Sequence, residues 1–335
     1  MESSRPKQQR VTIKDIAAAA DVDPSTVTRA LQGSDRVKAA TRQRISALAT
    51  QMGYVPNMAA RTLVTQRSQL LGLVVPDMTN PFFADLARGV EEESASQRLR
   101  ILIRNTDGDE VAEREAIRFF LELKVDGMLV PMARSSDAFY KTLSDEIPLI
   151  HINRVDARHH VSCDMAYGTR AVVDHLIELG HRRIGFVTGP ASPAQRPKRH
   201  GYEAALRGAG IAIDDDLVLH FDGSLACVEA LADAVLRVAP TAVFAWNDVC
   251  AMGLIRALRD RGIAVPADVS VAGHDDIALA ACYDPPLTTV HWPMYELGQQ
   301  AVRYLFRVNA GEANYDPAIP PPTLVVRGST SEPPR

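Results

Sequence analysis

A short run of side chains near the start of the chain has the types and spacing needed to contact the edges of nucleic-acid bases. Asp23 followed by Pro24 predicts the start of a helix. Aspartate caps free backbone amides, and proline loses no hydrogen bond at the first helical position. Ser25, Thr28 and Arg29 then lie on the first turns of this helix. Arginine reads guanine through two parallel hydrogen bonds, and the alternatives for Arg29 are a phosphate contact and a solvated surface charge.

The segments around this helix complete a three-helix unit. Thr12 is a good cap for a helix from Ile13, and Asp15 stands where the acid of a capping box is expected. A third, amphipathic helix is predicted over about 39–52, with Gly53 as its left-handed end. Three helices in this space indicate a helix-turn-helix unit, whose second helix enters the major groove of DNA. Phosphate contacts, which orient such a unit without reading sequence, are expected from Thr12, Ser25, Thr26, Arg42 and Arg44.

Charge is distributed unevenly along the chain. The 335 residues carry a formal net charge of -4. Residues 1–68 hold 11 lysines and arginines against 5 acidic residues, a net of +6, which leaves -10 for the rest. A basic segment favours a polyanion and an acidic one repels it, so only the first segment is a candidate for nucleic acid. A solvated basic surface is the alternative explanation of this charge.

Several stretches resemble the headpiece of the lactose and galactose repressor (LacI/GalR) family. They are VTIKDIA at 11–17, DVDPSTVTR at 21–29, GYVPN at 53–57 and ARTL at 60–63. The match is specific in order, residue type and spacing. It implies that Pro24 and Ser25 occupy the first recognition positions. One departure is Lys38, where the family usually has a serine or asparagine that caps the third helix, and this cap should be weaker here.

The same resemblance assigns a role to the segment that follows the headpiece. This segment is too short and too poor in large apolar residues to fold alone. In the family it becomes a hinge helix in the dimer on DNA, where a leucine opens the central base step in the minor groove. Leu63 matches that leucine, and its alternative role is an apolar contact with the following domain. Near the DNA backbone and groove we expect Asn57, Ala60 and Arg61.

Beyond residue 69 the pattern changes to short apolar runs that alternate with segments of helical period. This alternation predicts α/β architecture, with parallel sheets covered by helices, and so many units require two doubly wound lobes. In open parallel sheets, ligands bind beyond the carboxyl ends of the strands. The expected strands are 70–75, 101–103, 127–130, 149–152, 184–187, 243–245 and 269–272.

Polar and aromatic residues follow these runs and are the candidates for a ligand cleft. Any one of them alone is more often a helix cap or a turn residue. The body also resembles the effector domain of the same family, itself similar to periplasmic sugar-binding proteins, through NPFF at 80–83, LGHRRIGF at 179–186 and PPLTTV at 285–290. The resemblance implies that Asn153, Asn247 and Asp275 bind ligand hydroxyls. Further candidates are Asp77, Asn80, Phe82, Phe83, Arg196, Lys198 and Trp292.

Two of these candidates depart from the family pattern. Lys198 stands where the family usually has an arginine, and Arg196 or Arg199 can take that role if the loop is shifted. Trp292 stands where many relatives have glutamine, and a core position is equally compatible with it. The cluster of cations that ends at His200 suggests an effector with a carboxylate or phosphate, such as a sugar acid or sugar phosphate. A neutral sugar with surplus surface cations remains the alternative.

Two other functional classes fit less well. His274, Asp275 and Asp276 offer acid–base groups for an enzyme, but GxSxG, P-loop, HExxH and GxGxxG motifs are absent. A transport-type sugar-binding protein needs a secretory signal, and residues 1–10 are polar and basic with no apolar segment behind them. We therefore expect a cytoplasmic transcriptional regulator, most simply a repressor, that spans no membrane and needs no cofactor or metal.

The predicted organisation follows from these patterns. A homodimer is expected, because one headpiece buries too little surface to select an operator in double-stranded DNA. We predict a headpiece at 1–56, a hinge at 57–68, an effector-binding and dimerisation domain at 69–330 and a tail at 331–335. Within that domain, lobe one is predicted over about 69–160 and 294–320, and lobe two over about 161–291 and 321–330.

Overall fold

Local capping signals shape the first of the two units into which the chain divides, Met1–Ser68 and Gln69–Arg335. The computed structural model describes residues 11–55, 62, 67–143, 146–190, 192, 194–312 and 315–334. Among the described residues, no helix is both long and apolar enough to cross a bilayer.

Three helices form the described part of the first unit: α1 (Ile13–Ala20), α2 (Pro24–Leu31) and α3 (Ala39–Gln51). The predicted capping box is confirmed: Thr12 Oγ1 accepts from the Asp15 amide, and the Asp15 carboxylate accepts from the Thr12 amide at 2.8 Å.

The other predicted helix ends of this unit are also confirmed. The Asp23 carboxylate accepts from the Ser25 amide at 2.7 Å, and Gly53 ends α3 with φ +68°. Lys38 precedes α3 without a side-chain cap, as its residue type predicted. The apolar faces of the three helices meet around Ile16 and Ile45, which are fully buried.

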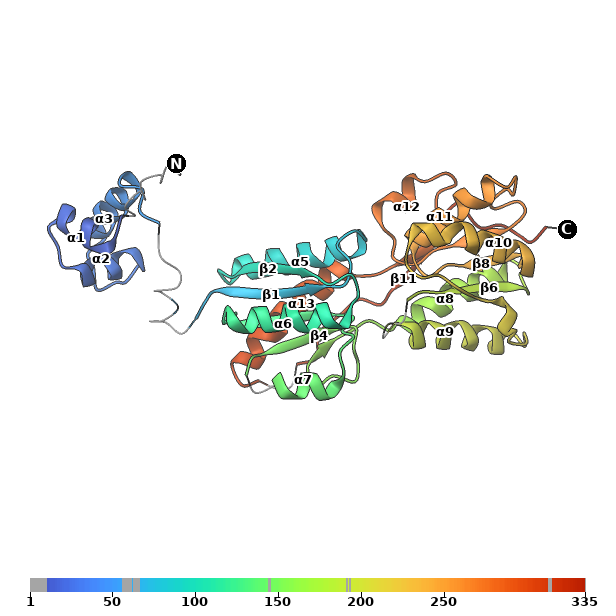
Figure 1. Cartoon of the computed structure of the whole chain (residues 1–335), viewed down its shortest axis with the longest axis horizontal. Helices are drawn as coiled ribbons and strands as arrows, with labels where there is room; N and C mark the ends of the chain where they lie inside the picture. The colour runs from blue at the N-terminus through green and yellow to red at the C-terminus, as the bar shows by residue number, and fades with distance from the viewer. Residues whose placement is uncertain are drawn as a thin grey trace, which may run out of the picture. The chain divides into compact units, whose positions relative to one another are not determined.

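Lobe one of the second unit is built on a parallel sheet with the strand order β2-β1-β3-β4-β5 (Figure 1). Helices α5 and α13 pack on one face of the sheet, and α6 and α7 share a separate apolar core on the other. The strands are β1 (Leu70–Val75), β2 (Arg100–Asn105), β3 (Gly127–Pro131), β4 (Leu149–Ile152) and β5 (His160–Val161), and the helices are α5 (Phe82–Ser96), α6 (Glu110–Glu122), α7 (Asp137–Leu143) and α13 (Met294–Asn309).

Lobe two is built on a second parallel sheet with the order β7-β6-β8-β9. Helices α8 and α9 pack against each other, as do α10 and α11 (Figure 1). The strands are β6 (Ile184–Thr188), β7 (Val218–His220), β8 (Ala242–Phe244) and β9 (Ser270–Ala272), and the helices are α8 (Met165–Glu178), α9 (Gln195–Gly208), α10 (Val228–Val238), α11 (Asp248–Arg259), α12 (Ala278–Cys282) and the 3₁₀ turns η1 (Asp215–Leu217) and η2 (Leu225–Cys227).

The chain passes between the lobes after β5, after β10 (Thr289–His291) and before β11 (Thr323–Val325). These last two strands pair antiparallel as a separate two-stranded sheet. All seven predicted strands are present, with ends that agree within two residues. Four short strands, β5, β7, β10 and β11, were not predicted. The two parallel sheets place the ends of β1 and β4 in lobe one and of β8 and β9 in lobe two as candidate ligand-binding edges.

Candidate DNA-binding and effector sites

Helix α2 presents the side chains that were predicted to meet DNA bases. Pro24, Ser25 and Arg29 are exposed, whereas Thr26 and Thr28 are half-buried. The Thr28 hydroxyl donates to the Pro24 carbonyl at 3.0 Å, so it holds the first turn of the helix. Ser25 and Arg29 are four residues apart and therefore share one exposed face. This face has the polar and basic character that base and phosphate contacts require.

The proposed phosphate contacts have additional roles inside the headpiece. The guanidinium of Arg42 donates to the Gly33 carbonyl at 2.9 Å, and that of Arg44 donates to the Ala20 carbonyl at 2.8 Å. The Thr12 hydroxyl donates to the carboxylate of Asp15 at 2.7 Å. These bonds hold the three helices and their turns together. The predicted hinge residues Asn57, Ala60, Arg61 and Leu63 lie outside the described residues.

In the second unit, residues that follow the strands of the two sheets meet where the lobes join. Asn80, beyond β1, donates through Nδ2 to Oδ2 of Asp275, beyond β9, at 3.4 Å. Asn80 Oδ1 also accepts from the Phe82 amide at 3.0 Å, which fixes the amide orientation. Asp275 is 9% exposed and has φ +136°, a backbone conformation that strains a residue with a side chain. The surrounding fold therefore holds this carboxylate in position.

Lys198 is buried in the same region. Its Nζ donates to the Trp246 carbonyl at 2.8 Å and lies 4.0 Å from the centroid of the Trp246 ring. Burial lowers the pKa of Lys198 to about 8, and the charges of Asp275 and Asp248 oppose that effect. Asp248 is fully buried, and burial raises its pKa to about 6. Burial also raises the pKa of Asp275 well above its usual value. One buried ammonium thus shares this region with two buried carboxyl groups.

His274 is a buried histidine with one unpaired ring nitrogen. Its Nδ1 lies 3.2 Å from the Trp292 indole Nε1, which can only donate, and 3.2 Å from Oδ1 of Asp275. Burial holds the pKa of His274 well below its usual value, which keeps the ring neutral. His274 Nε2 is buried and has no hydrogen-bond partner among the described residues. This nitrogen is therefore available to a polar group of a ligand.

Asn153 provides a second buried nitrogen without a partner. Its Oδ1 accepts from the Cys163 amide at 3.1 Å, whereas its Nδ2 is buried and has no hydrogen-bond partner within the described part of the chain. Asn153 also has a left-handed backbone, with φ +58°. A buried polar group without a partner costs about 1–3 kcal/mol. Asn153 and His274, each just beyond a strand of its own lobe, therefore each have a buried nitrogen available to a ligand.

Other predicted effector residues have structural partners. The Asp77 carboxylate accepts from the amide and hydroxyl of Thr79 in a turn. Asn247 caps α11 by accepting from the Cys250 amide at 2.8 Å. Phe82 and Phe83 are buried and pack edge to face, with ring centroids 5.3 Å apart. Asp77 and Asn247 thus have the turn and helix-cap roles that were the alternative to ligand binding for these residue types.

The predicted cation cluster is not gathered at one site. Arg199 pairs with Glu203 and Asp215 at 2.7 and 2.8 Å. Arg196 and His200 are exposed, and only Lys198 of the four is buried against Trp246. Trp246 was not among the predicted site residues. It directly follows the predicted strand 243–245, so the rule that ligands bind beyond strand ends should have included it.

Comparison with known proteins gives consistent matches. Residues 12–57 match the family model described as bacterial regulatory proteins, lacI family, and residues 173–330 match a periplasmic binding protein-like domain. The HTH-type transcriptional regulator DegA of Bacillus subtilis is 36% identical over 96% of this chain and 98% of its own. The repressor CytR of Escherichia coli is 32% identical over 98% of both chains.

Solved structures show the same similarity across the chain. A lac repressor dimer bound to operator and the anti-inducer ONPF has a TM-score of 0.86 and 26% identity, over 96% of this chain and 100% of that one. The transcriptional regulator CelR in complex with cellobiose has a TM-score of 0.71 and 29% identity, over the same shares of the two chains. The similarity thus extends across both units and both lobes.

Proposed function

Because the chain belongs to the LacI family of bacterial regulatory proteins, we propose that it is a repressor that binds a pseudo-palindromic operator as a homodimer. Members of this family are transcriptional regulators and not enzymes. The proposal includes a small effector, bound where the two lobes meet, that changes the affinity for DNA. Such a protein works in the cytoplasm, where bacterial DNA lies.

The exposed face of α2 carries the DNA-binding part of this proposal. Arg29 is exposed there and has the donor geometry for guanine, while Pro24 and Ser25 stand at the start of the helix where base edges are met. The net charge of +6 over residues 1–68 supports attraction to DNA phosphates, and the rest of the chain is acidic.

An exposed apolar surface supports the homodimer. Ile103 of edge strand β2 is 40% exposed, and Phe119 and Leu123 at the end of α6 are 38% and 40% exposed. An edge strand and a neighbouring apolar helix face together favour association with another protein surface. A lac repressor dimer is the assembly recorded for one similar structure. We therefore assign this surface, defined by Ile103, Phe119 and Leu123, to the contact between two copies of the chain.

The charges at the lobe junction favour a neutral sugar over a sugar acid. Lys198 and Asn153 supply donors, His274 supplies a ring nitrogen and Asp275 supplies an acceptor, which together suit several hydroxyl groups. Burial raises the pKa of Asp275 well above its usual value and that of Asp248 to about 6. The region therefore already disfavours negative charge, and an anionic ligand would add more of it. CelR is bound to the neutral sugar cellobiose, which supports the same class here.

Selection of DNA sites from a random-sequence pool tests the operator proposal. The full-length chain should enrich a palindromic site, and Arg29→Ala should lose about 1–3 kcal/mol of discrimination at one base pair of each half-site. The control Arg237→Ala alters an exposed arginine of α10 and should keep the wild-type site. Enrichment of a single, non-repeated half-site would contradict the dimer. An unchanged base preference in Arg29→Ala would contradict the proposed contact between Arg29 and a base.

A thermal-shift comparison tests the effector proposal. Neutral sugars are measured beside their acids, for example glucose beside gluconate and glucuronate, with cellobiose and ribose as further neutral sugars. A ligand that binds only the folded state stabilises it by about 2.7 kcal/mol at one hundred times its dissociation constant. We expect the best stabiliser to be a neutral sugar that also changes operator affinity. A larger shift with the acid of a pair would contradict the charge argument.

A further inference from the structure

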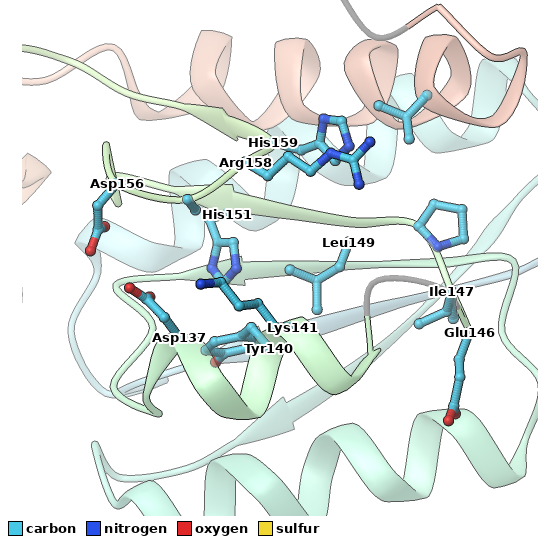
Figure 2. A pocket seen from close by; sticks show the side chains of 13 residues that line it. Asp137, Tyr140, Lys141, Glu146, Ile147, Leu149, His151, Asp156, Arg158 and His159 are labelled. Atoms are coloured by element: carbon cyan, nitrogen blue, oxygen red, sulfur yellow. The ribbon is translucent and has the colours of Figure 1, made fainter.

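A pocket lies in lobe one, away from the lobe junction. It is formed by α7, by β4 and the turn that follows it, and by the end of α13 (Figure 2). Its volume is about 640 Å³, and small-molecule sites typically measure about 300–1,000 Å³. None of Asn80, Lys198, His274 and Asp275 lines it. The pocket is therefore separate from the proposed effector site.

His151 lines this pocket and has an unused polar atom. Only 5% of the residue is exposed, and Nδ1 has no hydrogen-bond partner among the residues described. Its ring meets Tyr140 edge to face, with centroids 4.4 Å apart. Burial, and to a smaller extent the charge of nearby Arg154, lowers the pKa of His151 to about 3, so the ring is neutral. A neutral imidazole that is buried beside a cavity can hydrogen bond to a ligand without adding charge.

The acidic residues at the pocket are already compensated. Buried Arg154 pairs with Asp137 and, at 3.4 Å, with Asp156. The carboxylate of Glu146 extends away from the other labelled side chains in Figure 2. Arg158, by contrast, forms no ion pair with any residue that the structure describes. Among the described lining residues, Arg158 is therefore a cation that is available to an external anion.

The remaining wall is apolar and separates the two polar features. Leu149 and Ile147 are buried, and Val308 of α13 completes this surface. In Figure 2, His151 lies to the left of Leu149 and the Arg158 side chain lies above it. A ligand that fills the pocket thus needs an apolar body and an anionic end, with a polar atom or a ring edge toward His151.

We propose that this pocket is a second ligand site, which binds a small organic carboxylate. The carboxylate pairs with the planar guanidinium of Arg158, whose fork matches its two oxygens. The apolar body covers Leu149 and Ile147, and a polar atom or ring edge reaches His151. This site does not depend on the effector assignment at the lobe junction, because the two sites share no side chain.

Calorimetric titration of the full-length chain with 2-naphthoate and its neutral counterpart 2-naphthamide tests this site. The acid should bind at least ten times more tightly than the amide. Arg158→Ala should lower the affinity for 2-naphthoate at least tenfold and leave the affinity for 2-naphthamide unchanged. The matched control Arg118→Ala, an exposed arginine of α6 in the same lobe, should bind 2-naphthoate as wild type does.

A second variant locates the ligand independently of charge. His151→Phe keeps a ring against Tyr140 but removes both nitrogens, and it should weaken both probes about threefold or more. Circular dichroism checks that this buried substitution leaves the fold intact, and Arg158→Ala carries the test alone if it does not. Equal affinity for acid and amide, no binding of either probe, or full affinity for 2-naphthoate in Arg158→Ala would each overturn the proposal.

Discussion

Two buried cations, one in each lobe, have contrasting surroundings. Arg154 of lobe one donates to the Ser135 carbonyl at 2.7 Å, pairs with Asp137 and Asp156, and lies over the Tyr140 ring. Among the described residues, Lys198 of lobe two has one hydrogen-bond acceptor, the Trp246 carbonyl, and lies against the face of the Trp246 ring. The guanidinium of Arg154 thus has several partners within the protein, whereas the ammonium of Lys198 has three donors and one acceptor in the described part of the chain.

This difference indicates which cation stabilises the fold and which is available to a ligand. An arginine fork with several acceptors holds neighbouring segments together, and its charge stays fixed. A buried lysine with few acceptors has a lowered pKa, and its ammonium gains from any further oxygen. We infer that Arg154 contributes mainly to stability and Lys198 mainly to effector binding. The following predictions test this contrast, from the largest expected effect to the smallest.

Arg154→Met should lower the free energy of unfolding by about 2–3 kcal/mol, because the substitution removes charge-assisted hydrogen bonds to the buried Ser135 carbonyl and to the Asp137 carboxylate, together with the ion pair to Asp156. For a unit of this size the melting temperature falls by roughly 5–10 °C. Thermal unfolding followed by circular dichroism measures the change. Arg118→Met, at an exposed position of α6, should stay within about 0.5 kcal/mol of wild type. Equal stability of the two variants would remove the contrast.

Lys198→Met should keep the fold and weaken the sugar identified by thermal shift about 10- to 100-fold, since a hydrogen bond from a charged group contributes about 1.5–3 kcal/mol. Calorimetry measures the affinity. The neighbouring Arg199→Met removes a cation that pairs outward with Glu203 and Asp215 and should bind the sugar within about twofold of wild type. The assignment fails if Arg199→Met is the weaker binder.

The pH dependence of effector binding should reveal the same lysine. The pKa of Lys198 is lowered to about 8, so its ammonium is present at pH 7 and mostly lost at pH 9. We expect the affinity for the sugar to fall about tenfold over this range in wild type and to stay flat in Lys198→Met. A parallel decrease in both proteins would assign the titration to another group.

The lowered pKa of Lys198 also predicts how the stability of the fold changes with pH. The unfolded chain keeps the Lys198 proton up to its ordinary pKa of 10.5, whereas the folded chain releases it near pH 8. Between these values the unfolded state binds more protons, so the stability of wild type relative to Lys198→Met should rise with pH. Chemical denaturation of both proteins at pH 7.5 and 10 measures this difference, and a fall would contradict the assigned pKa direction.

An exposed lysine gives the smallest effect. Lys38 precedes α3 and offers no side-chain acceptor to its first amides. Lys38→Ser supplies that acceptor and should raise the stability of the headpiece by about 0.5–1 kcal/mol. Lys38→Ala removes the charge without adding a cap and serves as the control. If both variants gain equally, the effect comes from charge at the helix terminus and not from capping.

Where the signals are local, the residues alone predicted the structure well. The caps at Thr12 and Asp23 and the glycine at 53 act within one helical turn, so the headpiece helices were located almost to the residue. The apolar strands were also found, including β8 and β9 with three residues each. Strands β5, β7, β10 and β11 have only two or three residues as well, but each contains a histidine or a threonine and gives no apolar run. They form because distant segments supply their pairing partners.

Sequence alone therefore determined the family, the helix-turn-helix unit, the α/β lobes and the strand ends at which we propose the ligand site. Tertiary structure decided which cation is buried near these strand ends. Lys198 and Arg199 are adjacent in α9, and neighbouring residues of a helix point about 100° apart. Packing against Trp246 turns Lys198 inward and leaves Arg199 beside Glu203 and Asp215. The pocket around His151 likewise exists only because α7, β4 and α13, distant in sequence, meet in the folded lobe.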